Sequence, residues 1–174
     1  MTTHQPLPAQ AVEPWLRGTL TDVPPVTRAV LHALELAHED ILRWCADLSD
    51  EQWNVHPFGL VPVAFHVRHL SRAIDRLLTY AEGRQLNVTQ IAVMKSELDP
   101  GAAGADVIVE FATTLNVSAE RIRAFAPADL DLPRGVGKKS LPTTVAGLLV
   151  HVADHTQRHV GQAIVTAKLV KSLR

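Results

Sequence analysis

Histidines recur at every fourth position near the end of the chain, at His151, His155 and His159. Residues four apart on an α-helix lie one turn above each other on the same face. Two imidazoles placed in this way can bind one metal ion, and a histidine from another helix would complete a three-ligand site. The spacing therefore indicates a candidate metal centre.

A second pair of histidines, His66 and His69, lies in an earlier segment that has the periodicity of an amphipathic helix. His66 falls on the apolar stripe of this segment, and His69 lies at the edge of the stripe. Helical-wheel arithmetic slightly favours His66 as the third ligand, and both stay open on this ground alone. A set of imidazoles without carboxylates suits zinc, nickel, copper or iron better than magnesium or calcium.

Carboxylates are missing from the positions where a zinc protease would need one. No glutamate follows His155, so the general base of that mechanism is absent and the sequence names no replacement. Asp75 and Asp154 are candidates for orienting an imidazole. An exposed charge on a solvated helix face is the simpler interpretation of both.

Apolar residues at intervals of three and four predict the elements that would position these histidines. Long helices are expected over residues 25–46, 62–83, 104–125 and 143–171, and a short one over 88–97. Strand signals are confined to a short extended piece around 130–142. The expected fold class is all-α, a four-helix bundle with short extra helices.

The proline-rich and polar start of the chain differs in composition from the rest. Residues 1–24 are therefore predicted to be an N-terminal arm, with one short turn at 13–17, and residues 25–174 to be the bundle domain. The single cysteine, Cys45, falls among apolar residues late in the first long helix, and we expect a buried structural thiol there.

Charge and hydropathy exclude several classes of partner. Lys and Arg number 17 and Asp and Glu 18, without a basic stripe, which argues against a nucleic-acid partner. No apolar run approaches the roughly 18 residues of a membrane span. The N-terminus lacks the pattern of a signal peptide, and the lone cysteine fits a reducing compartment, so a cytoplasmic protein is expected.

Two segments together resemble the DinB/YfiT-like superfamily of small bacterial four-helix metalloproteins. They are Val63-Ala-Phe-His-Val-Arg-His69-Leu and His151-Val-Ala-Asp-His155-Thr-Gln-Arg-His159-Val-Gly-Gln162. The resemblance covers roughly residues 24–171. It implies an up-down-down-up bundle, commonly a homodimer, in which one histidine of the second long helix and two of the fourth hold the metal.

By motif position, the ligands that this resemblance implies are His69, His155 and His159. His69 is preferred to His66 because the family's histidine in the second helix is followed by leucine, as His69 is here. His66, His151 and Gln162 are then expected to line the pocket or to support the ligands.

Characterised members of that superfamily use the metal with a low-molecular-weight thiol such as bacillithiol, mycothiol or glutathione. The leading hypothesis is therefore a metal-dependent enzyme, with zinc or nickel, that activates a thiol for S-transfer or a water for hydrolysis of a small-molecule substrate. A non-catalytic metal-binding or stress-response bundle is the alternative. A metal-free helical interaction protein with hydrogen-bonded histidines is the third hypothesis.

Overall fold

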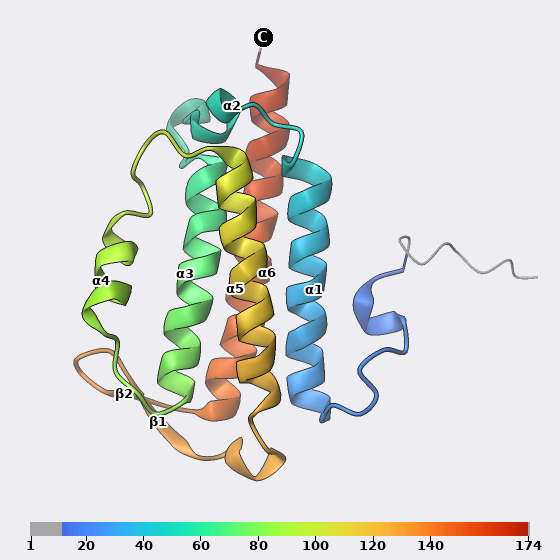
Figure 1. The fold of residues 1–174 in the computed structure, drawn as a ribbon, viewed down its shortest axis with the longest axis vertical. Helices are drawn as coiled ribbons and strands as arrows, with labels where there is room; N and C mark the ends of the chain where they lie inside the picture. Colours follow the sequence, from blue (N-terminus) through green and yellow to red (C-terminus); the bar gives the residue numbers. More distant parts are fainter. Residues whose placement is uncertain (1–11, 174) are drawn as a thin grey trace, which may run out of the picture.

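The computed structural model describes residues 12–173, and its architecture is a bundle of four long helices (Figure 1). These helices are α1 (Pro25–Cys45), α3 (Val63–Ala81), α5 (Gly104–Arg123) and α6 (Val145–Ser172). In Figure 1, α1 and α6 run toward the end of the bundle where the C-terminus lies, and α3 and α5 run the opposite way. The prediction of an all-α bundle is confirmed.

Helix ends follow from local chemistry. Pro25 occupies the first turn of α1, where a missing N–H costs nothing. Gly83, with φ +77°, adopts the left-handed conformation just after α3 and terminates it. The Thr144 hydroxyl accepts a hydrogen bond from the Gly147 N–H at 3.1 Å and caps α6. The predicted boundaries of the long helices are therefore correct to within about two residues.

Shorter elements join the long helices. They are α2 (Asp50–Asn54), α4 (Val88–Lys95), the strands β1 (Pro133–Val136) and β2 (Leu141–Thr144), and 3₁₀ turns at Pro14–Leu16, Pro57–Gly59 and Pro127–Asp129. The two strands pair antiparallel, with Pro133 opposite Thr144, and this hairpin leads directly into α6. The expected extended piece at 130–142 thus contains β1, the turn of the hairpin and the first two residues of β2.

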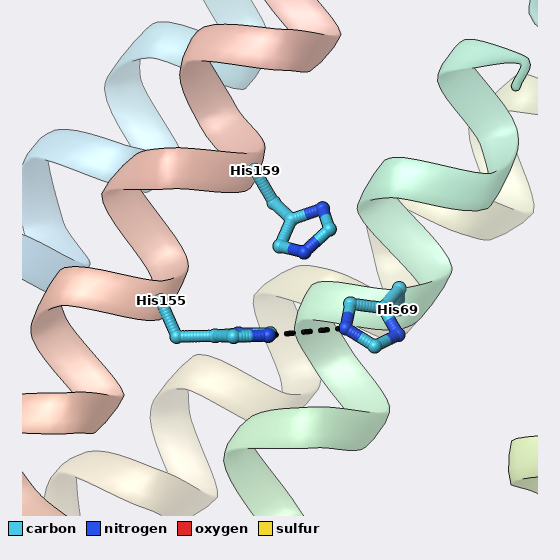
Figure 2. Close-up of side chains that lie close together, drawn as sticks. All are labelled: His69, His155 and His159. Atoms are coloured by element: carbon cyan, nitrogen blue, oxygen red, sulfur yellow. Dashed lines mark hydrogen bonds between the residues drawn. The ribbon is translucent and has the colours of Figure 1, made fainter. Parts of the chain in front are cut away.

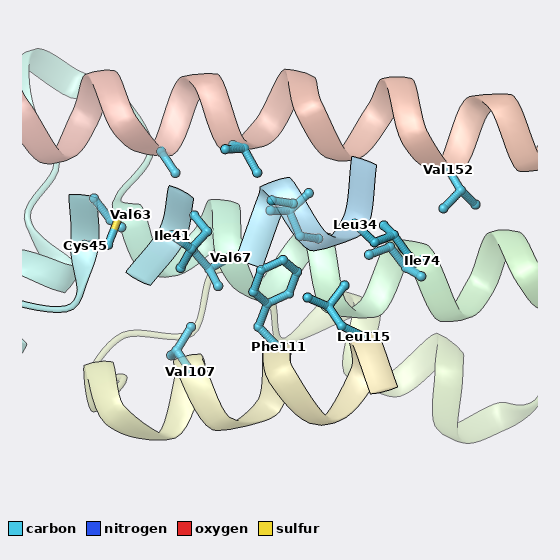
Figure 3. Close-up of a cluster of buried hydrophobic side chains, with 14 of the residues drawn as sticks. Leu34, Ile41, Cys45, Val63, Val67, Ile74, Val107, Phe111, Leu115 and Val152 are labelled. Atoms are coloured by element: carbon cyan, nitrogen blue, oxygen red, sulfur yellow. The ribbon is translucent and has the colours of Figure 1, made fainter. Parts of the chain in front are cut away.

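The core lies along the axis of the bundle, and all four long helices contribute to it (Figure 3). Phe111 of α5 and Ile41 of α1 are fully buried, and so is Trp53 of α2 at one end. Cys45 is also fully buried, as predicted, and burial raises the pKa of its thiol to about 12. A thiol held in this state is a packing group and not a nucleophile.

The connection between α3 and α5 is long because the two helices are neighbours that run in the same direction (Figure 1). The chain must return along the bundle between them, and residues 82–103 do so, carrying α4 past the outside of α3. This return brings the residues after α4 alongside the turn of α3 that carries Arg68 and His69.

The described part of the N-terminal arm is fastened to α1. Arg17 donates hydrogen bonds to both carboxylate oxygens of Glu39, the Nη2–Oε2 distance being 2.8 Å, and Thr19 lies 3.1 Å from the Nε2 of His32. Residues 1–11 of the predicted arm, including the stretch without a signal-peptide pattern, lie outside the described residues. None of the helices between residues 12 and 173 has the length and apolar character needed to cross a membrane.

Candidate metal centre

Two histidines of α6 and one of α3 meet on one side of the bundle (Figure 2). His155 and His159 are one turn apart on α6, and His69 comes from the facing turn of α3. Each offers one ring nitrogen such that the three nitrogens all lie within 4.8 Å of one another. The three residues that family resemblance implies as ligands are therefore brought together.

The rings are packed against one another as well as being adjacent. The Nε2 atoms of His69 and His155 lie 3.2 Å apart, and the ring centroids of His69 and His159 are 4.5 Å apart. Phe65, one turn before His69 on α3, stacks on the His69 ring, with the ring centroids 5.5 Å apart and an angle of 20° between the ring planes. This stacking limits the rotation of the His69 imidazole and fixes the direction in which its nitrogens point.

A carboxylate holds the far side of His69. The Nδ1–H of His69 donates to Oε2 of Glu97 at 2.7 Å, since an ionised carboxylate can only accept. Glu97 is 7% exposed, and its other oxygen accepts from Arg76 at 2.7 Å. Burial raises the pKa of Glu97, but the hydrogen bonds from His69 and Arg76 outweigh it and hold the pKa below its usual value. Since Nδ1 donates to Glu97, Nε2 of His69 is the nitrogen that faces His155.

His66 contacts His159 of the cluster but is not one of the three residues whose nitrogens converge. Its Nδ1 lies 3.2 Å from the Nδ1 of His159, and the residue is 4% exposed. With the Nδ1 of His159 occupied in this way, its Nε2 is the nitrogen left for a ligand. The apolar stripe does carry His66 to the inside, as the helical wheel predicts, but the group of three converging nitrogens consists of His69, His155 and His159 and does not include His66.

Electrostatics keeps these imidazoles neutral. Burial, together with the neighbouring histidines, lowers the pKa of His66, His155 and His159 to about 4 in each case. Burial is the largest cause for all three, because it penalises the charged form. At neutral pH these rings therefore carry free lone pairs, which is the form that binds a metal.

The donor set fits a transition metal. Two nitrogens bound to one tetrahedral zinc at about 2.0–2.1 Å would be about 3.3 Å apart, and the His69 and His155 Nε2 atoms are 3.2 Å apart. The Nδ1 of His155 is buried without a hydrogen-bond partner among residues 12–173. A cation among the three nitrogens would bind Nε2 of His155, which faces His69, and Nδ1 of His155 would then carry the ring proton.

The other predicted site residues divide into two groups. His66 and Gln162 line a cavity of about 530 Å³ beside the cluster. His151 does not line it: its side chain is 46% exposed, its Nδ1 lies 3.7 Å from Asp154, and its ring centroid is 5.4 Å from that of His155. His151 is thus an outer neighbour of the cluster.

Glu97 was missed by sequence reasoning, together with the Arg76 that holds it. The two aspartates considered from sequence bind elsewhere. Asp75 accepts from Arg121 at 2.7 Å, and Asp154 accepts from Arg158 at 2.6 Å. Glu97 follows a short helix 28 residues after His69, and no spacing rule links the two. Its place at the end of the short helix predicted over 88–97 is the one signal that could have suggested it.

Comparison with known proteins gives the family. No curated protein matches the chain. Residues 33–163 match the DinB superfamily, a span that begins in α1, ends in α6 and contains every histidine of the cluster. Since the match covers well over half of the sequence, the chain belongs to the DinB superfamily.

Proposed function

We propose that this protein is a metal-dependent enzyme in which His69, His155 and His159 hold one divalent transition metal ion, zinc or nickel. The observation that carries the proposal is the convergence of three ring nitrogens within 4.8 Å of one another. Three protein ligands leave a coordination position open, which is the mark of catalytic zinc sites as opposed to structural ones.

The bound cation would lower the pKa of a thiol or a water molecule and so provide a nucleophile at neutral pH. The residues of the chain prepare the site for this. Glu97 keeps the proton of His69 on Nδ1 and so presents the Nε2 lone pair, and Arg76 keeps Glu97 ionised. Phe65 holds the ring plane of His69. S-transfer from a low-molecular-weight thiol and hydrolysis are the two reactions that this arrangement supports.

The thiol, the homodimer and the cytoplasmic location stay predictions. The thiol and the homodimer come from family resemblance, and the location comes from the lone Cys45, which fits a reducing compartment. Light scattering on the purified protein would test the homodimer. A mass of one chain at micromolar concentration would contradict it.

Metal content tests the proposal directly. Untagged protein should contain about one equivalent of zinc or nickel per chain, measured by elemental analysis, since three imidazoles bind a single ion. His155→Ala should lose that metal. His151→Ala is the matched control, because it removes a histidine one turn earlier on α6 that lies outside the three-nitrogen group. Equally low metal in the wild type and in His155→Ala would instead favour a metal-free helical interaction protein.

Turnover separates the enzyme from a non-catalytic metal-binding or stress-response bundle. The metal-loaded protein should accelerate the reaction of a model electrophile with bacillithiol, mycothiol or glutathione, or should hydrolyse an activated ester. A chelator should abolish the rate, and His155→Ala should lack it. Stoichiometric metal without turnover in any of these assays would favour the non-catalytic bundle.

A further inference from the structure

A cavity of about 530 Å³ lies between the segment that precedes α3 and the turns of α6 from Arg158 to Thr166. Leu60 and Val61 form one wall, and Val165 and Thr166 form the other. Leu60 and Val165 are 47% and 56% exposed, so these apolar side chains are left uncovered within the described chain. The volume and the mainly apolar wall are those of a small-molecule site.

Gly161 opens this cavity. It lies inside α6, where glycine is the poorest helix former after proline, so its presence needs a reason. Close packing is not the reason, because a Cβ at Gly161 would meet nothing within 4 Å. Gly104 at the start of α5 shows the contrast: a Cβ there would overlap the Trp53 indole. At Gly161, then, the missing side chain leaves space in the wall of the cavity.

Four polar side chains also line the cavity: His66, Arg158, Gln162 and the buried Thr166. The Nδ1 of His66 is 3.2 Å from the Nδ1 of His159, so the cavity is separated from the histidine cluster by a single imidazole. Arg158 supplies positive charge at the border. Its bond to Asp154 at 2.6 Å joins two side chains that are both 55% exposed, and exposed ion pairs of this kind are readily exchanged.

We propose that this cavity binds the apolar body of a small organic substrate that carries an anionic group, with the anion at Arg158 and Gln162. The inference rests on the proposed function, since it names the class of substrate that the metal site would act on. Seated in the cavity, the substrate lies against His66 and beside the cluster. Its apolar body replaces water on Leu60, Val61 and Val165, and this burial provides most of the affinity.

Binding can be tested without metal, by fluorescence titration of chelator-treated protein with two apolar dyes. One is neutral, N-phenyl-1-naphthylamine, and the other is anionic, 8-anilinonaphthalene-1-sulfonate. Both should bind the wild type. Gly161→Leu should weaken both at least about tenfold by filling the cavity, while thermal unfolding occurs at the same or a higher temperature because leucine is the better helix former. A loss of binding in a protein of unreduced stability cannot be a loss of folding.

Two further variants complete the test. Val150→Leu, which enlarges an exposed side chain of α6 outside the cavity, should bind both dyes like the wild type. Arg158→Gln should weaken the anionic dye several-fold more than the neutral one. Unchanged dye affinity in Gly161→Leu would overturn the cavity as the binding site, and equal effects of Arg158→Gln on both dyes would overturn the anionic group. Since no metal is present, failure here is distinct from absence of metal in the wild type, which counts against the proposed function alone.

Discussion

Glu97 accepts a hydrogen bond from the Nδ1 of His69 at 2.7 Å, although His69 lies in α3 and Glu97 lies 28 residues later, in the long return connection between α3 and α5. The path of the return connection therefore decides which group binds Nδ1 of His69. The carboxylate selects which nitrogen of His69 carries the proton, and it makes the other nitrogen a better ligand. Arg76 completes the arrangement by binding the second oxygen of Glu97.

Glu97→Gln should weaken metal binding about 10- to 100-fold, the usual cost of losing the partner of a metal-binding histidine. Glutamine keeps the shape of the side chain but loses the charge that fixes the His69 proton on Nδ1 and pairs with Arg76. Competition with a chromophoric chelator would measure the affinity. Glu110→Gln is the matched control, because Glu110 of α5 pairs at 2.9 Å with Arg72 of α3, the helix that carries His69, and takes no part in the cluster. Equal affinities for the two variants would refute the role of Glu97.

The metal-free protein should lose stability as the pH falls from about 6.5 to about 4. The pKa of His66, His155 and His159 is about 4 in the folded chain and about 6.5 in the unfolded one. Between those values the unfolded chain binds more protons, so acid favours unfolding, and the stability contributed by neutral histidines is complete above about pH 6.5. Urea denaturation midpoints across this range would measure the effect.

His66→Gln offers a check on that assignment. Glutamine can still bond to His159 but does not titrate, so the fall in urea midpoint between pH 6.5 and 4 should be smaller than in the wild type. An identical pH dependence would show that His66 is not among the groups responsible.

Gly104→Ala should destabilise the fold by about 1–3 kcal/mol, because its Cβ would overlap the buried Trp53 indole and force α2 and α5 apart. Gly161→Ala is the paired control in α6. With open space around that Cβ, alanine should stabilise the helix by about 0.5–1 kcal/mol. Chemical denaturation would show changes of opposite sign in the free energy of unfolding of the two variants. An unchanged free energy of unfolding in Gly104→Ala would contradict the close packing against Trp53.

Phe111→Ala should cost about 3–5 kcal/mol of unfolding free energy, since it removes a fully buried ring from the centre of the core. Val109 lies on the solvent-facing side of the same helix and is 63% exposed, so Val109→Ala should change the free energy of unfolding by no more than about 0.5 kcal/mol. Urea titration of both variants would test this, and a similar small cost for both would place Phe111 outside the core.

Periodicity predicted the helices because each long helix buries one stripe and exposes the rest, as with Ile41 and Phe111 inside and Val109 outside. Capping chemistry at Thr144 and Gly83 fixed their ends. Spacing likewise predicted that His155 and His159 share a face, because the i, i+4 relation is local. These features depend on neighbours in sequence.

Long-range features were not predictable in the same way. The choice between His66 and His69 depends on how far α3 is rotated toward α6, and the helical wheel of a single helix does not contain that rotation. Glu97 depends on the route of the return connection, and the cavity depends on the approach of Leu60 to α6. Each is a property of two segments brought together by packing.

His155 follows His69 by 86 residues, and α6 is the last helix of the bundle to leave the ribosome. During synthesis, His69 and Glu97 emerge long before the imidazoles they face. A nascent chain that has reached only α5 offers a single histidine of the cluster, too few for tight chelation. Binding of a metal would therefore follow the synthesis of α6, and an ion bound then would stabilise only chains in which α6 has already packed against α3.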